Sequence, residues 1–182
     1  VEHSYRGFAG GENLPAGIAL SVSNSGQLSG GAGTPAIAAS VITAMGDEEY
    51  DFVIHPYTDS TSLDAWALEY NDGTGRWSPL RQVYGHCYSA LRGTLGSLVS
   101  AGQLRNDQHH TIAAIDDDTQ APVWEYAAAY GGANAVGLLV DPARPTQTLP
   151  LNGIMPPRPG KRFVWNERQT LLNYGIATSV VN

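Results

Sequence analysis

The sequence predicts an α/β fold in which a small, doubly wound, mainly parallel sheet is flanked by helices. Apolar, strand-like runs alternate with helical patterns at intervals of about thirty residues, as in βαβ crossovers. The length of 182 residues suits one main hydrophobic core. The prolines are concentrated between residues 142 and 159, which indicates an extended Pro-rich C-terminal extension beyond the sheet.

The first 33 residues predict an N-terminal β segment that belongs to a neighbouring or inserted region. Residues 17–23 alternate weakly between apolar and polar side chains, and Asn24-Ser25-Gly26 breaks this pattern as a turn. The run Gly30-Gly31-Ala32-Gly33 provides a second break. We therefore expect strands joined by a Gly-rich turn before the main domain begins at residue 34.

The main domain, residues 34–145, is expected to open with a short amphipathic helix. Thr34 and Pro35 suit the N-cap and the first helical position, and Gly46 suits the end of the helix. Between these positions, apolar residues recur at helical spacing, namely Ile37, Ala38, Val41, Ile42 and Met45.

Three cycles of strand and helix are predicted to follow and to form the α/β core. The strands are expected at residues 51–56, 82–88 and 110–115. The helices are expected at residues 62–70, from Leu95 after an N-cap at Thr94, and from about Pro122 to Val140. Crossovers of this kind bury a parallel sheet between layers of helices.

Residues 146–182 are predicted to form an extended Pro-rich segment, a helix and a terminal strand. Proline lacks the amide hydrogen that a helix interior needs, so the segment from Pro145 to Pro159 can cross the surface only as extended chain. The helix is expected near Asn166 to Tyr174, and the strand from Ile176 to Val181.

Composition argues against several classes of partner. The formal charge of −7 opposes binding to phosphate backbones. The densest basic group is expected to solvate a loop and a helix end, and it consists of Arg158, Lys161, Arg162 and Arg168. No run approaches the roughly 18 apolar residues of a membrane helix, and no secretion signal opens the chain. We therefore expect no nucleic-acid binding and no membrane insertion.

The cysteine content and the first residue bear on the origin of the chain. Cys87 is the single cysteine, so an intrachain disulfide and a Cys-rich zinc site are excluded and synthesis in a reducing cytoplasm is expected. The sequence opens on Val1 without an initiator Met, and we expect it to be a fragment of a longer polypeptide.

The carboxyl ends of the predicted strands are the first place to look for chemistry, because open α/β sheets bind ligands there at a switch point. Six residues with useful side chains fall at these ends: Thr58, Asp59, Arg92, Asp116, Asp117 and Asp118. Three consecutive aspartates could hold Mg²⁺, since hard cations favour carboxylate oxygen. Acidic residues before a helix also form turns and cap free amides, which is the simpler interpretation.

Other candidate sites lack a required residue or spacing. The segment Gly30-Gly31-Ala32-Gly33-Thr34 has neither the Lys of a P-loop nor the full G-x-G-x-x-G pattern. Cys87 lies in a predicted strand beside His86, which points to the opposite face, so a buried thiol is favoured over a Cys–His hydrolase. The pair His109-His110 lacks the i, i+4 spacing of a zincin.

The four tryptophans fall in or beside predicted helices, where they are expected to fill the core or grooves, and they are Trp66, Trp77, Trp124 and Trp165. No set of residues combines a nucleophile, a base and an orienting group in one pattern. The sequence therefore predicts no catalytic, cofactor-binding or metal-binding residues.

Two segments resemble the contractile tail sheath proteins of Mu-like bacteriophages and prophages. The stretch from Ala44 to Asp59 is similar to the region that joins a helix to the first strand in that family, and Asp141 to Leu151 resembles a later stretch. Similarity continues in residues 76–82 and 166–172. The resemblance covers about Gly33 to Thr178.

The resemblance implies a structural subunit and not an enzyme. Subunits of this family polymerise around the tail tube and contract after triggering at the baseplate, which drives the tube through the host envelope without nucleotide hydrolysis. The implied partners are other sheath subunits, the tail tube and the baseplate, and the implied location is the virion tail after assembly in the bacterial host cytoplasm. No cofactor is implied, and the isolated fragment is compatible with a monomer.

Two other functional classes stay open from the residues alone. An α/β hydrolase or nucleotide-binding domain would use the acidic strand ends and would gather Asp59, Asp116 and Asp118 around a perturbed carboxylate. A host-surface binding module would instead expose a cluster of aromatic side chains. The positions of these acids and aromatics in the fold distinguish the three classes.

Overall fold

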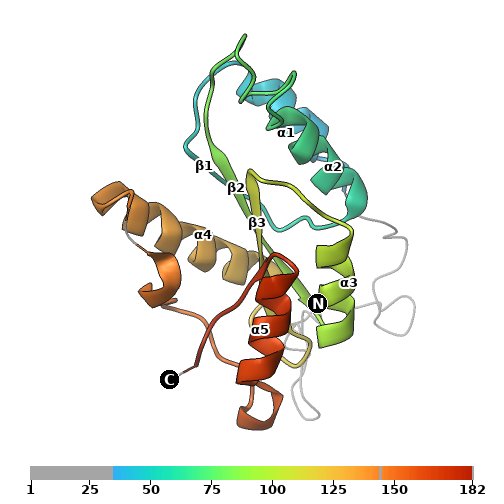
Figure 1. The fold of residues 1–182 in the computed structure, drawn as a ribbon, viewed down its shortest axis with the longest axis vertical. Coiled ribbons are helices and arrows are strands. Elements are labelled where there is room, and N and C mark those ends of the chain that lie inside the picture. The colour runs from blue at the N-terminus through green and yellow to red at the C-terminus, as the bar shows by residue number, and fades with distance from the viewer. Residues whose placement is uncertain (1–34, 144, 182) are drawn as a thin grey trace, which may run out of the picture. The chain divides into compact units, whose positions relative to one another are not determined.

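A computed structural model describes residues 35–143 and 145–181. The described residues form five α-helices and four strands (Figure 1). The strands are β1 (Phe52–Ile54), β2 (His86–Gly93), β3 (His110–Asp116) and β4 (Ile176–Ala177). The helices are α1 (Ala38–Met45), α2 (Ser60–Glu69), α3 (Leu95–Gln103), α4 (Val123–Val140) and α5 (Trp165–Asn173). The β segment expected over residues 1–33 and the N-cap expected at Thr34 lie outside the described residues.

The four strands form one parallel sheet in the order β1-β2-β3-β4. In the register, Phe52 lies opposite His86, Cys87 opposite His110 and Ile112 opposite Ile176. The predicted α/β class with a parallel sheet is therefore confirmed. The order of the described strands never reverses, so this sheet lacks the switch point at which strand-end residues were expected to meet.

Hydrophobic cores lie on both faces of the sheet, because alternate residues of each strand point in opposite directions. On one face, Leu98 of α3 and Leu171 of α5 pack with Ile112 and Ile176. On the other face, Tyr126 and Ala127 of α4 pack with Ala113 and Ile115. A third cluster joins α1 and α2 to β2 and contains Ala38, Trp66, Tyr70 and Cys87.

The small residues of α4 allow the helix to lie close to the sheet. Gly131 is buried, and a Cβ placed there would lie 2.7 Å from Cδ1 of Ile54 in β1. A side chain at this position would force α4 away from the strands. Within the described ranges, no helix is long and apolar enough to cross a membrane.

Most predicted elements are confirmed, and their differences have local causes. The N-cap at Thr94 is present, with its side chain accepting a hydrogen bond from the Ser97 amide. The second strand begins at His86 instead of residue 82. Gln82 has a positive φ of 52°, and the Val83 amide donates to the Arg76 carbonyl at 2.9 Å, which holds this segment in a loop.

The two ends of the described fold also differ from expectation. Helix α1 begins at Ala38 rather than at Pro35. Strand β4 covers only Ile176–Ala177, because the chain then leaves the sheet and Ser179 forms a hydrogen bond of 2.7 Å with the Tyr126 hydroxyl of α4. Both α5 and β4 contribute side chains to the main core.

Two adjacent leucines in α5 provide a test of this core. Leu171 is fully buried, whereas Leu172 is 51% exposed. We expect Leu171→Ala to lower the free energy of unfolding by about 2–5 kcal/mol, because it leaves a cavity. Leu172→Ala should lower it by less than about 1 kcal/mol. Urea denaturation of both variants measures the difference, and equal losses would contradict the packing of α5.

Candidate functional site

The acidic residues at the strand ends are occupied by local contacts. Asp59 is the N-cap of α2, and its Oδ2 accepts a hydrogen bond of 3.0 Å from the Ser62 amide. Asp116 Oδ1 accepts one of 2.9 Å from the Asp118 amide. Asp118 in turn accepts a hydrogen bond of 2.7 Å from Arg158 Nε and a second bond from the same guanidinium.

These contacts favour turn formation over metal binding. The hydrogen bond from Arg158 lowers the pKa of Asp118. Burial acts to raise the pKa of Asp59, but hydrogen bonds at Ser62 outweigh it and the net shift is downward. A general acid needs a raised pKa instead. Among the described residues, no group of three or more His, Cys, Asp or Glu side chains is arranged to hold a metal ion.

The capping role expected for these acids is only partly correct. Asp59 caps α2 as described above. Asp116 and Asp118 shape the turn after β3, but α4 begins after Pro122 with no side-chain cap. Pro122 is in an extended conformation just before the helix. Asp116 and Asp118 therefore lie several residues before the free amides of the first turn and do not cap them.

The rival enzymatic site is not assembled by the described fold. Asp59 comes after β1 and Asp116 is the last residue of β3, with β2 between the two strands. Two strand spacings amount to roughly 9–10 Å, too far for both carboxylates to act on one atom. Arg92, at the end of β2, donates to the carbonyl of Ala121 and so ties the sheet to the segment before α4. Thr58 lines a different hollow, beside Leu63 and Arg105.

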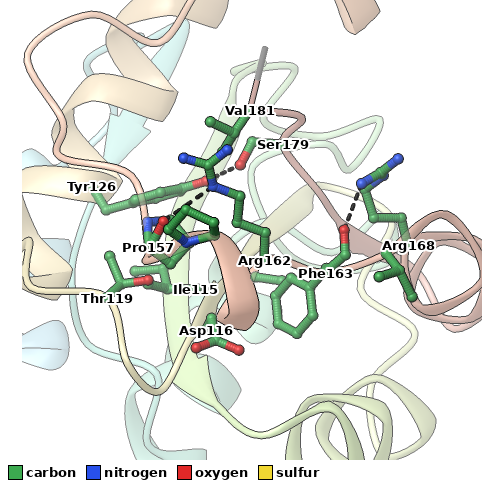
Figure 2. A pocket seen from close by; sticks show the side chains of 13 residues that line it. Ile115, Asp116, Thr119, Tyr126, Pro157, Arg162, Phe163, Arg168, Ser179 and Val181 are labelled. Atoms are coloured by element: carbon green, nitrogen blue, oxygen red, sulfur yellow. Dashed lines mark hydrogen bonds between the residues drawn. The ribbon is translucent and has the colours of Figure 1, made fainter.

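A cavity of about 240 Å³ lies beyond the carboxyl end of β3 (Figure 2). Asp116 lines it, but Asp59 and Asp118 do not. Two arginines on its wall bind carbonyls, with Arg162 Nε 3.2 Å from Pro157 O and Arg168 Nη1 2.5 Å from Phe163 O (Figure 2). These bonds fix the extended segment, and the lining offers no activated nucleophile.

The thiol and its neighbouring histidine are separated by the sheet, as the alternation of strand side chains predicts. Cys87 is 1% exposed, and burial raises the pKa of its thiol. His86 forms a hydrogen bond of 2.8 Å with the Thr111 hydroxyl on the opposite face. The expected burial of Cys87 is confirmed.

Histidines from the end of β1 and from the start of β3 lie beside two tryptophans, and the sequence analysis did not connect them. The rings of His55 and His110 lie 5.0 Å apart, and His55 stacks on Trp66 at 5.2 Å. His109 stacks on Trp77 at 4.1 Å and contacts Asp72 at 2.8 Å. Because β2 and β3 are parallel and begin with His86 and His110, these two histidines lie at the same end of the sheet, whereas His55 reaches His110 from the carboxyl end of β1. The strand pattern could therefore have placed His86 near His110, but not His55.

Ser89 and His110 are residue types that form catalytic pairs, but their surroundings do not suit catalysis. Ser89 Oγ lies 2.9 Å from His110 Nε2. Ser89 is fully buried, and burial, with smaller contributions from the charges of His55 and His86, lowers the pKa of His110 to about 3. A base this weak, facing a hydroxyl that solvent cannot reach, serves as a structural cross-strand hydrogen bond.

Two of the four tryptophans correct the expectation that all of them fill the core or grooves. Trp66 is 3% exposed and Trp77 donates a hydrogen bond of 2.9 Å to the Gly85 carbonyl. Trp124 is 50% exposed and Trp165 is 65% exposed. They lie in the first turns of α4 and α5, respectively, where these side chains lie beyond the buried stripe of each helix.

Exposed apolar residues on α4 and α5 form two candidate contact surfaces. On α4 they are Trp124, Val136, Leu139 and Val140, and on and beside α5 they are Val164, Trp165 and Leu172. Exposed aromatic and aliphatic side chains near basic groups are typical of protein interfaces. These residues are the candidates for contacts with other proteins.

Comparison with known proteins agrees with this description. A family model for the central domain of the phage tail sheath protein matches residues 30–182. The Mu-like prophage FluMu tail sheath protein of Haemophilus influenzae is 35% identical over 175 residues, which make up 96% of this chain. The chain spans 34% of that relative's length.

Proposed function

Because this chain belongs to the phage tail sheath family, we propose that it is the central domain of a structural subunit in a contractile tail. The subunit polymerises around the tail tube and contracts to drive the tube through the host envelope. Its partners are other sheath subunits, the tail tube and the baseplate. It assembles in the bacterial host cytoplasm, acts in the virion tail and catalyses no reaction.

The match over residues 30–182 is the observation that carries this proposal. The geometry supports it in two ways. Charged groups at the strand ends are bound to Ser62, Arg158 and backbone atoms instead of facing a shared cavity. Large apolar side chains such as Leu139 and Trp165 remain exposed, as surfaces that pack against other proteins do.

The packing of the domain suggests how it takes part in contraction. Helices on both faces of the sheet share continuous cores with β2 and β3. Close-packed cores resist continuous deformation, so movement between two arrangements occurs most readily as rigid-body motion at the surfaces. We propose that the domain keeps its fold while its contacts with neighbours change. Subunit structures from extended and contracted tails that show α2–α4 repacked would contradict this.

Electron microscopy of the full-length protein expressed alone tests the proposal. We expect regular tubes with a central channel, because sheath subunits carry the contacts for their own polymerisation. A matched sample of Leu171→Ala protein, in which the core is disrupted, should form far fewer tubes. Protein that stays monomeric under all salt and temperature conditions would count against the sheath assignment.

A further inference from the structure

The outer face of α5 carries an apolar and basic surface that the other described residues leave exposed. Trp165 and Leu172, two helical turns apart, lie on one side of α5 and are 65% and 51% exposed. Val164, just before the helix, is 59% exposed. Lys161 is exposed four residues before Trp165. We call these four residues the α5 surface.

Four basic residues lie in or beside the α5 surface, namely Arg158, Lys161, Arg162 and Arg168, and one acidic residue of α5, Glu167, accepts a hydrogen bond of 2.8 Å from the Val164 amide. Lys161 forms no salt bridge with any described residue, and Arg162 and Arg168 bind carbonyl oxygens rather than carboxylates. Arg158 is paired with Asp118. Tryptophan and arginine are the residues most enriched at energetic centres of protein interfaces. An acidic partner segment therefore suits this surface.

An acidic segment lies at the opposite end of the strands, just before β1. Residues 47–51, between α1 and β1, contain Asp47, Glu48, Glu49 and Asp51, and all of them are exposed. Asp47 pairs with Arg81, whereas Glu49 and Asp51 form no salt bridge with a described residue. Tyr50, at the centre of this acidic loop, is 39% exposed and can contribute apolar contact.

The two surfaces cannot meet within the described fold. The acidic loop leads into β1, and Asp51 O accepts a hydrogen bond of 2.9 Å from the His86 amide at the start of β2. The segment before α5 is bound by Asp118, just after the end of β3. The two ends of a strand as long as β2 lie roughly 25 Å apart. In Figure 1, α1 and α5 accordingly lie toward opposite ends of the strands.

We propose that the α5 surface binds the acidic loop of a second copy of this chain. Two copies of this chain, each with a formal charge of −7, repel one another unless opposite charges are paired at their contact. A contact between unlike surfaces at opposite edges is head-to-tail, and repetition of such a contact produces rings or open helices. The inference rests on the proposed function, for which repeated contacts of this kind are required.

Charge reversal in the full-length protein tests the contact. Glu49→Lys places like charges opposite Lys161, and Lys161→Glu places like charges opposite Glu49. We expect the amount of sedimentable tubes to fall by about tenfold or more in each variant alone, relative to the unmodified protein. An equimolar mixture should restore tubes, because the lysine introduced into the acidic loop of one variant then meets the glutamate introduced into the α5 surface of the other. Glu125→Lys, the same charge change on exposed α4, should leave assembly unchanged.

The outcomes separate the contact from the proposed function. Normal tubes from both single variants, or a mixture that fails to restore them, would overturn the head-to-tail contact. A loss of tubes in Glu125→Lys protein as large as in the two test variants would also overturn it. If the unmodified protein forms no tubes, the proposed function fails. Sedimentation velocity of the mixture of variants then tests the contact on its own. Association stronger than in either variant alone supports the contact, and equal sedimentation contradicts it.

Discussion

Arg76→Ala is expected to lower the free energy of unfolding by about 3–5 kcal/mol, because it breaks a buried ion pair and several hydrogen bonds. The Arg76 side chain is 0% exposed, and its Nε lies 2.9 Å from Glu69 Oε1. Its two terminal nitrogens donate to the Glu48 carbonyl at 2.7 Å and the Gly46 carbonyl at 2.6 Å. One guanidinium therefore joins the end of α2 to the acidic loop.

Arg81→Ala is the matched control. Arg81 contacts the same Glu69 oxygen at 3.1 Å and Asp47 at 2.9 Å, but its side chain is 28% exposed. Such partly exposed pairs contribute about 0–1 kcal/mol. Denaturant titration of both variants gives the two losses. If Arg76→Ala costs no more than Arg81→Ala, the buried network does not hold this region.

Acidification from about pH 6.5 to pH 4 is expected to lower the free energy of unfolding substantially. Burial lowers the pKa of His55 and of His86 to about 4 and that of His110 to about 3. In the unfolded chain these groups have ordinary pKa values near 6.5. Across this window the unfolded chain binds more protons, so stability is complete above pH 6.5 and falls as the pH drops. Each histidine contributes a slope of about 1.4 kcal/mol per pH unit.

His55→Phe isolates one part of this dependence. His55 is 6% exposed and stacks on Trp66, and phenylalanine retains this stack. We expect the slope of unfolding free energy against pH, near pH 5, to fall by about one third. Trp66→Phe, a packing change at the same contact, should lower stability equally at all pH values. An unchanged slope in His55→Phe protein would refute the role of this ring.

The fold was predictable where local pattern and tertiary packing agree. The third strand follows from an apolar run that is buried on both faces, and α2 and α3 follow from their spacing and caps. The second strand begins later than predicted because Val83, just before it, is bound to the Arg76 carbonyl in the preceding loop. Propensity within residues 82–88 contains no information about that contact.

The candidate site was less predictable for a similar reason. A single arginine in a polar stretch gives no sign of burial, so the sequence analysis did not single out Arg76. The tryptophans were assigned to the core or grooves by residue type, yet exposure of Trp165 depends on which side of α5 faces Leu98 and Ile112. The complementary acidic and basic segments were visible in the sequence, but their placement at opposite edges requires the sheet.

Antibody labelling of intact virions, read by electron microscopy, tests the central proposal most directly. An antibody raised against this chain should decorate the whole tail shaft of extended particles at regular intervals. After contraction is triggered, the label should be confined to the shortened sheath and leave the protruding tube bare. Label found only on the head or the baseplate, or label that stays on the bare tube, would contradict a role as the contractile sheath.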